Sequence, residues 1–542
     1  MSVPFTSLSP NNPVKDGDVQ SLLKGIDVEV DPAHAADFHK LLAAFHECAE
    51  VVSQLPDYQP RADTARYPRI NIHRPSKREQ VLGQAWAHKF HIQGNPAGGA
   101  LSGKRISLKD CICVAGVPQL LGTDVIPSWT PATDATVVTR VLDAGADILG
   151  TSTCENFCNS VSSFTSAQGT VENPFAPGYS AGGSTSGGAA LVGAGLVDIT
   201  LGADQGGSIR VPAAFCGCVG LKPTHGLVPF TGITSGDAVN DHVGPLARTV
   251  MEVAACLDAI SGYDGIDDRS QGSPKHGSTT FAASLNAQTT NLVGFKVGIL
   301  TEGFDNPAVD AAVKQAVLSA AHKFQTLGAT VEEVSMPGHK LGPYLWTIQQ
   351  RMAGGLNLMG HAAGRRGLYL TEFEQARLPW TSESFQRCFP ATQNVIINSL
   401  YLTQKFPGLY SKASNLGRQV RDDYEKLLEE YDVLITPTTP IVAPRNGVRG
   451  ASPLQAIEPS VGITTNTSVF DVTGQPAMSI PVGFAAAPDD PSVLLPVGMQ
   501  IVGALWQDAK VLRAGHAWES NFNWKESVPG GKKGAKTRVS SS

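Results

Sequence analysis

The sequence predicts an α/β protein in which helices sandwich a sheet, preceded by a helical arm. Short apolar runs at residues 106–108 and 146–149 alternate with helical patterns such as the one at 135–144. Such alternation of strand-like and helix-like segments is typical of α/β folds. The length of 542 residues exceeds what one simple core usually needs. We therefore expect a large fold with insertions, or two to three units.

Residues 1–90 are predicted to form a peripheral helical arm. Residues 35–55 place apolar side chains at helical spacing, and Pro32 and Pro56 stand at the two ends of this predicted helix. Such an arm commonly packs on the body or on a second subunit, so we expect a homodimer.

Residues 91–525 are expected to form the main domain, and its elements are predicted in order along the chain. They are a polar surface connection at 265–290, a strand at 293–300, a helix at 308–327, an inserted helical region at about 340–425, and strands at 433–436 and 477–482. The tail at 526–542 is basic and is expected to be disordered.

Composition excludes several classes of protein. The net charge is −6 with both signs interspersed, so nucleic acid is not an expected partner. No apolar run reaches the ~18 residues of a membrane span, and the first residues do not resemble a secretory signal. We expect no membrane association and a cytoplasmic location.

The nine cysteines are an odd number in a long chain, which favours reduced thiols over a disulfide scaffold. Six of them form close pairs without C-x-x-C spacing: Cys111 and Cys113, Cys154 and Cys158, and Cys216 and Cys218. We expect no metal site and no cofactor.

The informative segment is 178–226, where two clusters of glycine and serine place Ser184 and Ser208 24 positions apart. Glycines at this density cost folding entropy, so some feature must require them. A phosphate-binding loop would need a lysine directly after the glycines, and a dinucleotide fingerprint would need a third glycine and an acidic residue. Neither pattern is present.

An oxyanion site is the second interpretation of these glycines. Residues 204–208 can bring successive backbone N–H groups to one point, where they would stabilise a negative oxygen on an acyl group held by Ser208. A glycine-rich turn without chemistry fits the spacing equally well, and the spacing does not decide between them.

A nucleophilic Ser208 needs a base. No G-x-S-x-G elbow surrounds it, which argues against an α/β-hydrolase. His225 and His242 are near in sequence and are better interpreted as structural histidines. Lys109 directly follows an apolar run, and burial would lower its pKa from ~10.4 so that the neutral amine could accept a proton. Taken alone this signal is weak, because many lysines after strands reach solvent.

The motifs together resemble the amidase signature family, and most closely its bacterial nitrile-pathway and fungal amidases. The matching segments lie at 182–188, 204–212, 216–224, 244–248 and 474–477, within a similarity that runs from about residue 100 to 520. The resemblance implies an α/β/α sandwich around a large mixed, mostly parallel sheet.

The resemblance also implies the roles of the site residues. Ser208 matches the nucleophile, Ser184 the relay serine after a cis peptide bond, and Lys109 the base. The amides of Gln205, Gly206, Gly207 and Ser208 match the oxyanion hole, and Cys158, Ser160, Gly182 and Gly183 are expected to bind substrate. Ser186 stays open as an alternative relay, although the spacing favours Ser184.

Three functions are compatible with these residues. The favoured one is an amidase that hydrolyses small carboxylic amides, with ester, anilide or carbamate (urethane) hydrolysis as further activities. The second is a glutamine amidotransferase subunit that supplies ammonia to a tRNA-bound partner. The third, a catalytically inactive binding protein, ranks last because all three implied catalytic residues are present.

Overall fold

The computed structural model describes residues 8–126, 129–361 and 363–527, and the chain divides into two compact units, Met1–Gln59 and Pro60–Ser542. In the first unit, α1 (Asp18–Lys24) packs on α2 (Ala35–Gln54). The Asp31 carboxylate accepts a hydrogen bond from the Ala33 amide in the turn that leads into α2. Helix α2 lies where the spacing of the apolar residues predicts a helix.

The boundary between the units differs from the predicted end of the arm. Residue 90 lies inside a strand of the second unit, which begins at Pro60. This strand, β2 (Trp86–Ile92), is largely buried and pairs with both of its neighbours in the sheet. The helical unit is therefore about thirty residues shorter than expected.

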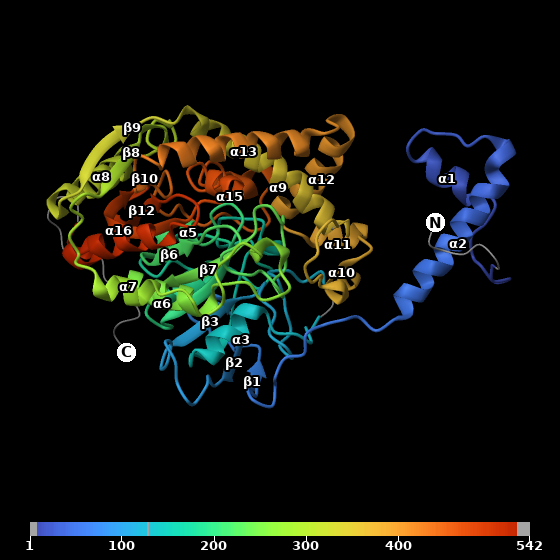
Figure 1. Ribbon diagram of the computed structural model, residues 1–542, viewed down its shortest axis with the longest axis horizontal. Coiled ribbons are helices and arrows are strands. Elements are labelled where there is room, and N and C mark those ends of the chain that lie inside the picture. The colour runs from blue at the N-terminus through green and yellow to red at the C-terminus, as the bar shows by residue number, and fades with distance from the viewer. Residues whose placement is uncertain (1–7, 127–128, 362, 528–542) are drawn as a thin grey trace. The chain divides into compact units, whose positions relative to one another are not determined.

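The second unit contains a sheet whose strands follow the order β1-β2-β4-β3-β5-β7-β6-β11-β12-β10-β8-β9 among the described residues. In Figure 1 the sheet extends from β1 and β2 at one edge to β8 and β9 at the other. The strands are β1 (Ile70–His73), β2, β3 (Arg105–Lys109), β4 (Asp147–Ser152), β5 (Ile199–Asp204), β6 (Val219–Lys222), β7 (His242–Ala247), β8 (Lys296–Leu300), β9 (Thr330–Val334), β10 (Val433–Pro437), β11 (Ala477–Ala487) and β12 (Asp490–Val502).

The α/β fold is confirmed, but the expectation of a mostly parallel sheet is wrong. Within the described chain, only β3–β4, β3–β5, β8–β9 and β8–β10 pair in parallel. The other neighbours are antiparallel. Two features cause this. Strands β11 and β12 form a long hairpin, which must be antiparallel, and β7 runs opposite to both β5 and β6.

Helices cover both faces of this sheet. On one face, Gly515 of α16 (Asp508–Asn521) lies against Met478 of β11. On the other face, Gly498 of β12 lies against Ala214 of α5 (Arg210–Cys216) and Ser479 of β11. Met478 and Ser479 are consecutive strand residues, so they point to opposite faces. The two helices therefore belong to different layers of a sandwich.

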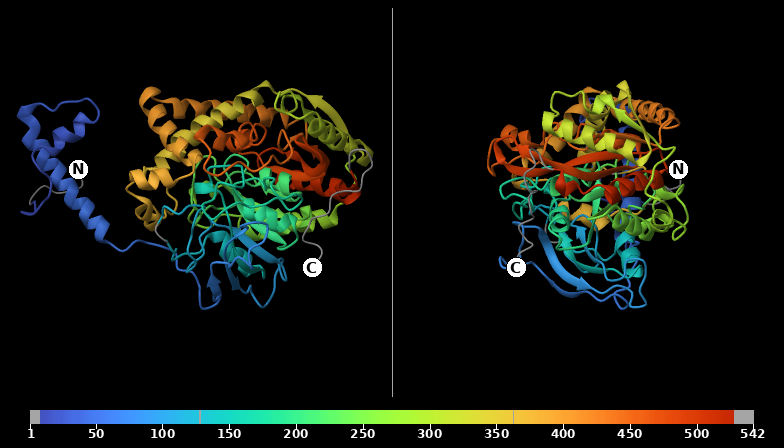
Figure 2. Two further views of the ribbon diagram at one scale, coloured as in Figure 1. Left: turned by 180° about the vertical axis from the view of Figure 1, so that it is seen from behind. Right: turned by 90° about the vertical axis from the view of Figure 1, so that its left-hand side faces the viewer.

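The region at 340–425 is helical, as its sequence predicts. It contains α9 (Gly342–Leu358), α10 (Thr371–Arg377), α11 (Ser382–Arg387), α12 (Pro390–Lys405) and α13 (Leu409–Leu427). Helices α12 and α13 both pack on α9, and the three stay together in opposite views of the molecule (Figures 1 and 2). The remaining α-helices are α3 (Thr136–Asp143), α4 (Ser186–Gly193), α6 (Val250–Ile260), α7 (Phe281–Ala287), α8 (Ala311–His322), α14 (Pro453–Ile457) and α15 (Val469–Thr473).

Four smaller features that the sequence analysis considered remain. All nine cysteines are free thiols. The predicted polar connection at 265–290 includes the short helix α7. The predicted tail lies outside the described residues from residue 528 on. None of the helices in the described part of the chain has the length and apolar character needed to cross a bilayer.

Candidate active site

Strand β3 directs Lys109 toward the helix layer that contains α4. Two residues earlier on the same strand face, Ser107 donates a hydrogen bond to Thr200 Oγ1 of β5 (2.9 Å). Thr200 in turn lies against Gly188 of α4. Because alternate strand residues share a face, Lys109 at the end of β3 points to the same side.

The side chains of Lys109, Ser184 and Ser208 form a hydrogen-bonded chain. Lys109 Nζ donates to Ser184 Oγ (2.8 Å) and to the carbonyl of Ala203 (3.1 Å), and Ser184 Oγ donates to Ser208 Oγ (3.0 Å). Ser184 precedes α4, Ser208 precedes α5, and all three residues are buried. The Gly183–Ser184 peptide bond is cis. The structure thus brings together residues that are 75 and 24 positions apart in the sequence.

Ser186, the alternative relay, has a different environment. Its hydroxyl donates to Glu155 Oε1 (2.7 Å), and the other oxygen of that carboxylate accepts from Thr165. Burial raises the pKa of Glu155 to about 7. Ser186 therefore belongs to a buried network beside the serine chain, and only Ser184 lies between Lys109 and Ser208.

The charge of Lys109 depends on a thiol that sequence reasoning did not place beside it. Burial lowers the pKa of Lys109, but a thiolate at Cys158 raises it, and the net direction is upward. Hydrogen bonds from the thiols of Cys111 and Cys154 hold the pKa of Cys158 well below its usual range. The expectation that burial lowers the pKa of Lys109 is therefore wrong in direction, because the neighbouring negative charge outweighs the effect of burial.

Only some of the backbone amides at the expected oxyanion hole lack a hydrogen-bond acceptor. The amides of Gly206 and Gly207 both donate to Asp204 Oδ1. The amides of Gln205 and Ser208 have no acceptor in the described chain. The two glycine amides were expected to point at the oxyanion, but in this structure they hold the Asp204 carboxylate.

Two separate contacts require the glycines of this segment. A Cβ on Gly206 would come within 2.5 Å of the indole ring of Trp346, which also donates its Nε1–H to the carbonyl of Gln205. Gly207 has a φ of +135°, and a Cβ there would come within 2.5 Å of Thr467 Oγ1. Trp346 was not predicted, because it lies on α9, more than a hundred residues away from Gln205.

A buried ion-pair network fixes the start of α5, and the sequence analysis missed it. The Arg210 guanidinium pairs with the carboxylates of Asp204 and Asp471 at 3.0 and 2.6 Å. Arg210 holds the pKa of Asp204 well below its usual range against the opposing effect of burial. A charged pair within a segment of small and apolar residues was the available signal, since such charges are buried only when paired.

Ser208 lines a cavity of about 320 Å³. Cys158 and Ser160 line it together with Gln205 and Gly206. The Ser160 hydroxyl lies 3.3 Å from that of Ser460 and accepts from the Ser162 amide. Gly182 and Gly183, which were expected to bind substrate, are buried and are not among the residues that line the cavity. Backbone of Pro212 and Ser160 lies against them instead.

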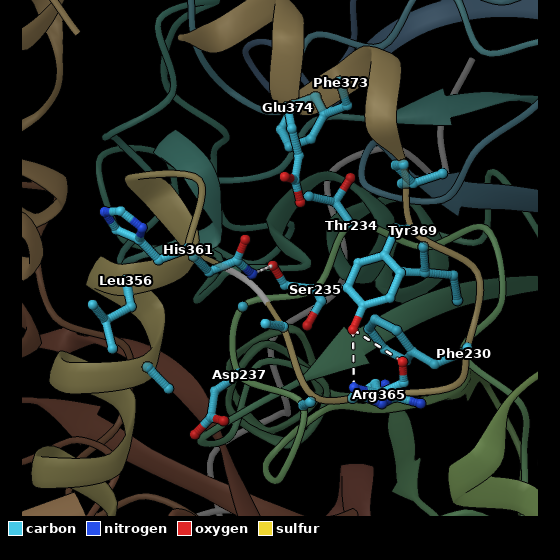
Figure 3. A pocket seen from close by; sticks show the side chains of 18 of the residues that line it. Phe230, Thr234, Ser235, Asp237, Leu356, His361, Arg365, Tyr369, Phe373 and Glu374 are labelled. Atoms are coloured by element: carbon cyan, nitrogen blue, oxygen red, sulfur yellow. Dashed lines mark hydrogen bonds between the residues drawn. The ribbon is translucent and has the colours of Figure 1, made fainter. Parts of the chain in front are cut away.

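A second cavity of about 290 Å³ contains none of the three chain residues. Figure 3 shows Tyr369 and Arg365 on one side of it: the tyrosine hydroxyl accepts from the Arg365 amide at 3.0 Å and donates to its carbonyl. A void of about 30 Å³ lies between the cavities and is bounded by Asn159 and Gln350, which also line the first. Of these described cavities, only the first is lined by a residue of the Lys109–Ser184–Ser208 chain, namely Ser208.

The two histidines considered as bases lie elsewhere. The rings of the half-buried His225 and the buried His242 pack against each other, with centroids 5.1 Å apart, and desolvation lowers the pKa of both. His242 Nδ1 contacts the carbonyl of Asn240, and neither ring is hydrogen-bonded to Ser208. They have the structural environment that the sequence suggests.

Comparisons with known proteins show what the chain is similar to. The family model described as Amidase matches residues 61–512. An enantioselective amidase of Rhodococcus rhodochrous is 38% identical over 77% of this chain and 79% of its own. A glutamyl-tRNA(Gln) amidotransferase subunit of Methanosarcina acetivorans is 34% identical over 90% of this chain and 99% of its own. The crystal structure of the corresponding subunit from Thermotoga maritima matches with a TM-score of 0.64 at 27% identity, covering 81% of this chain and 88% of that one.

Proposed function

We propose, from the premise that the chain belongs to the amidase family, that it hydrolyses carboxylic amides through an acyl-enzyme on Ser208. The observation that carries the proposal is the buried chain from Lys109 through Ser184 to Ser208, with hydrogen bonds of 2.8 and 3.0 Å. A lysine and two serines in this order give the nucleophile a path for its proton.

In the proposed first step, the neutral Lys109 amine takes a proton from Ser184 while Ser184 takes one from Ser208. The Ser208 oxygen forms a bond to the amide carbonyl carbon, and the carbonyl oxygen becomes negative. The free amides of Gln205 and Ser208 are the donors best placed to stabilise this oxygen, since those of Gly206 and Gly207 are engaged by Asp204.

The same chain then returns the proton. Lys109 gives it back through Ser184 to the leaving nitrogen as the C–N bond breaks, which releases ammonia or an amine and leaves an ester on Ser208. Water attacks this ester in the second half of the cycle, with its proton passing along the same path. Protonation of the nitrogen matters because an amine anion is a very poor leaving group.

A serine-reactive fluorophosphonate tests the assignment of the nucleophile. We expect one equivalent to bind covalently, with the added mass on the peptide that contains Ser208, and we expect Ser208→Ala to lose both labelling and amide hydrolysis. Ser160→Ala, which removes another hydroxyl of the same cavity, should still be labelled. Full hydrolytic activity in Ser208→Ala would exclude the mechanism.

The chemistry extends in principle to esters, anilides and carbamates, because each has a carbonyl that can acylate Ser208. We propose amides as the main substrates and the others as further activities. Turnover rates for acetamide, benzamide, an anilide and ethyl carbamate would rank them. Only the last of these measures urethane hydrolysis.

The amidotransferase subunits among the relatives support a second candidate function, in which ammonia from glutamine passes to a tRNA-bound partner. This function would require a stable complex with partner proteins and dependence on glutamine as the amide. Rapid hydrolysis of amides other than glutamine by the isolated chain would exclude it.

We also propose that the protein is a cytoplasmic homodimer. The nine free thiols suit a reducing compartment, which supports the location. Exposed apolar side chains on α2 support self-association. No step of the mechanism above uses a metal or a cofactor.

A further inference from the structure

One face of α9 forms a wall of the catalytic cavity. The residues of α9 that line the cavity recur at helical spacing: Pro343, Trp346, Thr347, Gln350 and Arg351. Trp346 lies against Gly206, directly beside the nucleophile segment. Arg351 is five residues farther along, which places it about 7.5 Å along the helix axis from Trp346.

Arg351 has fewer hydrogen-bond and ionic partners than the more deeply buried arginines of the structure. Its Nη1 donates to Gln350 Oε1 at 2.7 Å, which is a neutral acceptor. No carboxylate forms an ion pair with it in the described chain, and burial alone lowers its pKa. By contrast, the buried Arg210 pairs with aspartate, and the buried Arg140, which has no ion pair in the described chain, donates to several backbone carbonyls.

The cavity wall holds one negative group, the Cys158 thiolate, and its charge is already balanced by Lys109. Among the other described residues that line the cavity, Arg351 is the single charged side chain. The others are apolar, or carry hydroxyl or amide groups. A partly buried guanidinium without a counter-ion is costly, and that cost falls when a ligand brings the negative charge.

We propose that Arg351 is a specificity-determining residue that binds a carboxylate on the substrate. This inference rests on the proposed amidase function and narrows its substrates to amides that carry a carboxylate a short chain away from the scissile bond. The planar guanidinium matches a carboxylate with two parallel hydrogen bonds. Gln350 restrains it from the other side, because Gln350 Nε2 is itself anchored to Asn159 Oδ1 at 3.1 Å.

Two families of carboxylate-bearing amides fit this chemistry, and paired substrates distinguish them. If the carboxylate belongs to the acyl part, glutaramate should exceed its neutral isostere 5-methylhexanamide in kcat/KM. If it belongs to the leaving amine, N-propionyl-β-alanine should exceed N-(3-methylbutyl)propanamide. We expect a preference of about tenfold or more in one pair, since a charge-assisted hydrogen bond is worth roughly that much.

The Arg351→Met variant tests whether this side chain causes the preference. We expect the ratio of kcat/KM within the preferred pair to fall by about 10- to 100-fold, with most of the change in KM. Arg351→Lys keeps a positive charge and should retain an intermediate ratio. The matched control is Arg418→Met on α13, which is exposed and should leave the ratio unchanged.

The outcomes separate the two proposals. If wild-type enzyme hydrolyses both members of each pair equally, or if Arg351→Met keeps the wild-type ratio, the carboxylate site is wrong while the amidase function stands. If no amide is hydrolysed and Ser208 is not labelled, the proposed function itself fails. Circular dichroism of each variant ensures that a lost ratio does not reflect unfolding.

Discussion

The Cys158 thiolate opposes the lowering of the Lys109 pKa by burial. The mechanism needs a neutral amine, yet a thiolate at Cys158 raises the pKa of Lys109. The Cys158→Ala variant removes this thiolate but leaves Lys109 buried, so the pKa of Lys109 should fall. Because the unprotonated amine is the active form, activity should then persist to lower pH. We predict that the acid limb of the kcat/KM profile moves to lower pH.

The profile should be compared with that of Cys48→Ala, which removes an exposed thiol of the first unit and should leave the limb in place. An acid limb that stays where it is in Cys158→Ala, or that moves to higher pH, would show that the thiol does not control the base.

Ser184 and Ser186 form a matched pair, since they are two residues apart and have different partners. Ser184→Ala interrupts the path between Lys109 and Ser208, and we predict a loss in kcat of roughly 10²–10⁴. Ser186→Ala removes a donor from the buried Glu155 and should mainly lower stability, by about 1–3 kcal/mol. Steady-state kinetics and urea unfolding of both variants check this. A greater loss of kcat in Ser186→Ala would reverse the assignment.

At this scale, motifs could place Lys109, Ser184 and Ser208, because their family pattern is specific. They could not show that Cys158 lies beside Lys109 or that Asp204 holds the amide of Gly206. Those contacts depend on how loops fold back: Phe157 and Cys158 both have positive φ, at 47° and 58°, which no composition signal indicates.

Among the elements, α9 limits what the nucleophile segment can tolerate. A Cβ on Gly206 would come within 2.5 Å of the Trp346 ring, so Gly206→Ala must displace either the helix or the segment. We predict a fall in kcat of about 10²–10³, the typical effect of losing one oxyanion donor. Combining it with Trp346→Ala should restore part of the loss, because the space is then free.

Gly272→Ala provides the control for this prediction, since the nearest atom to a Cβ there is 3.9 Å away. Its kinetics should equal those of the wild type. If Gly206→Ala alone also retains full kcat, then the contact with α9 does not position the oxyanion donors.

The existence of most elements could be predicted, but strand direction could not. Apolar runs at 106–108 and 146–149 correspond to β3 and β4, which do pair in parallel. The direction of β7 between β5 and β6 is set by tertiary pairing of chain segments that carry no directional pattern. The short connection between β11 and β12 is a sequence signal for an antiparallel hairpin. Even so, only the first of these two strands was predicted.

In the whole molecule, the proposed catalysis and the proposed self-association involve different units. The lysine, the two serines and the lining of the catalytic cavity all lie within Pro60–Ser542. The first unit carries a stripe of exposed apolar side chains on α2, in which Phe38, Phe45 and Val52 recur every seven residues. This spacing keeps the three on one side of the helix, as in helices that pair with a copy of themselves.

This separation allows the dimer to be tested without disturbing catalysis. We predict that the wild type has about twice the 57.0 kDa mass of one chain in light scattering, and that Val52→Glu has the mass of one chain. Val52 is 64% exposed, so the charge should not unfold the unit but should oppose burial between two copies.

The control is Lys40→Ala, on the opposite side of α2, which should remain a dimer. Because the described residues that line the proposed catalytic cavity all belong to the second unit, kcat per chain should be the same in all three proteins. A parallel loss of mass and kcat would mean that the dimer contributes to the site.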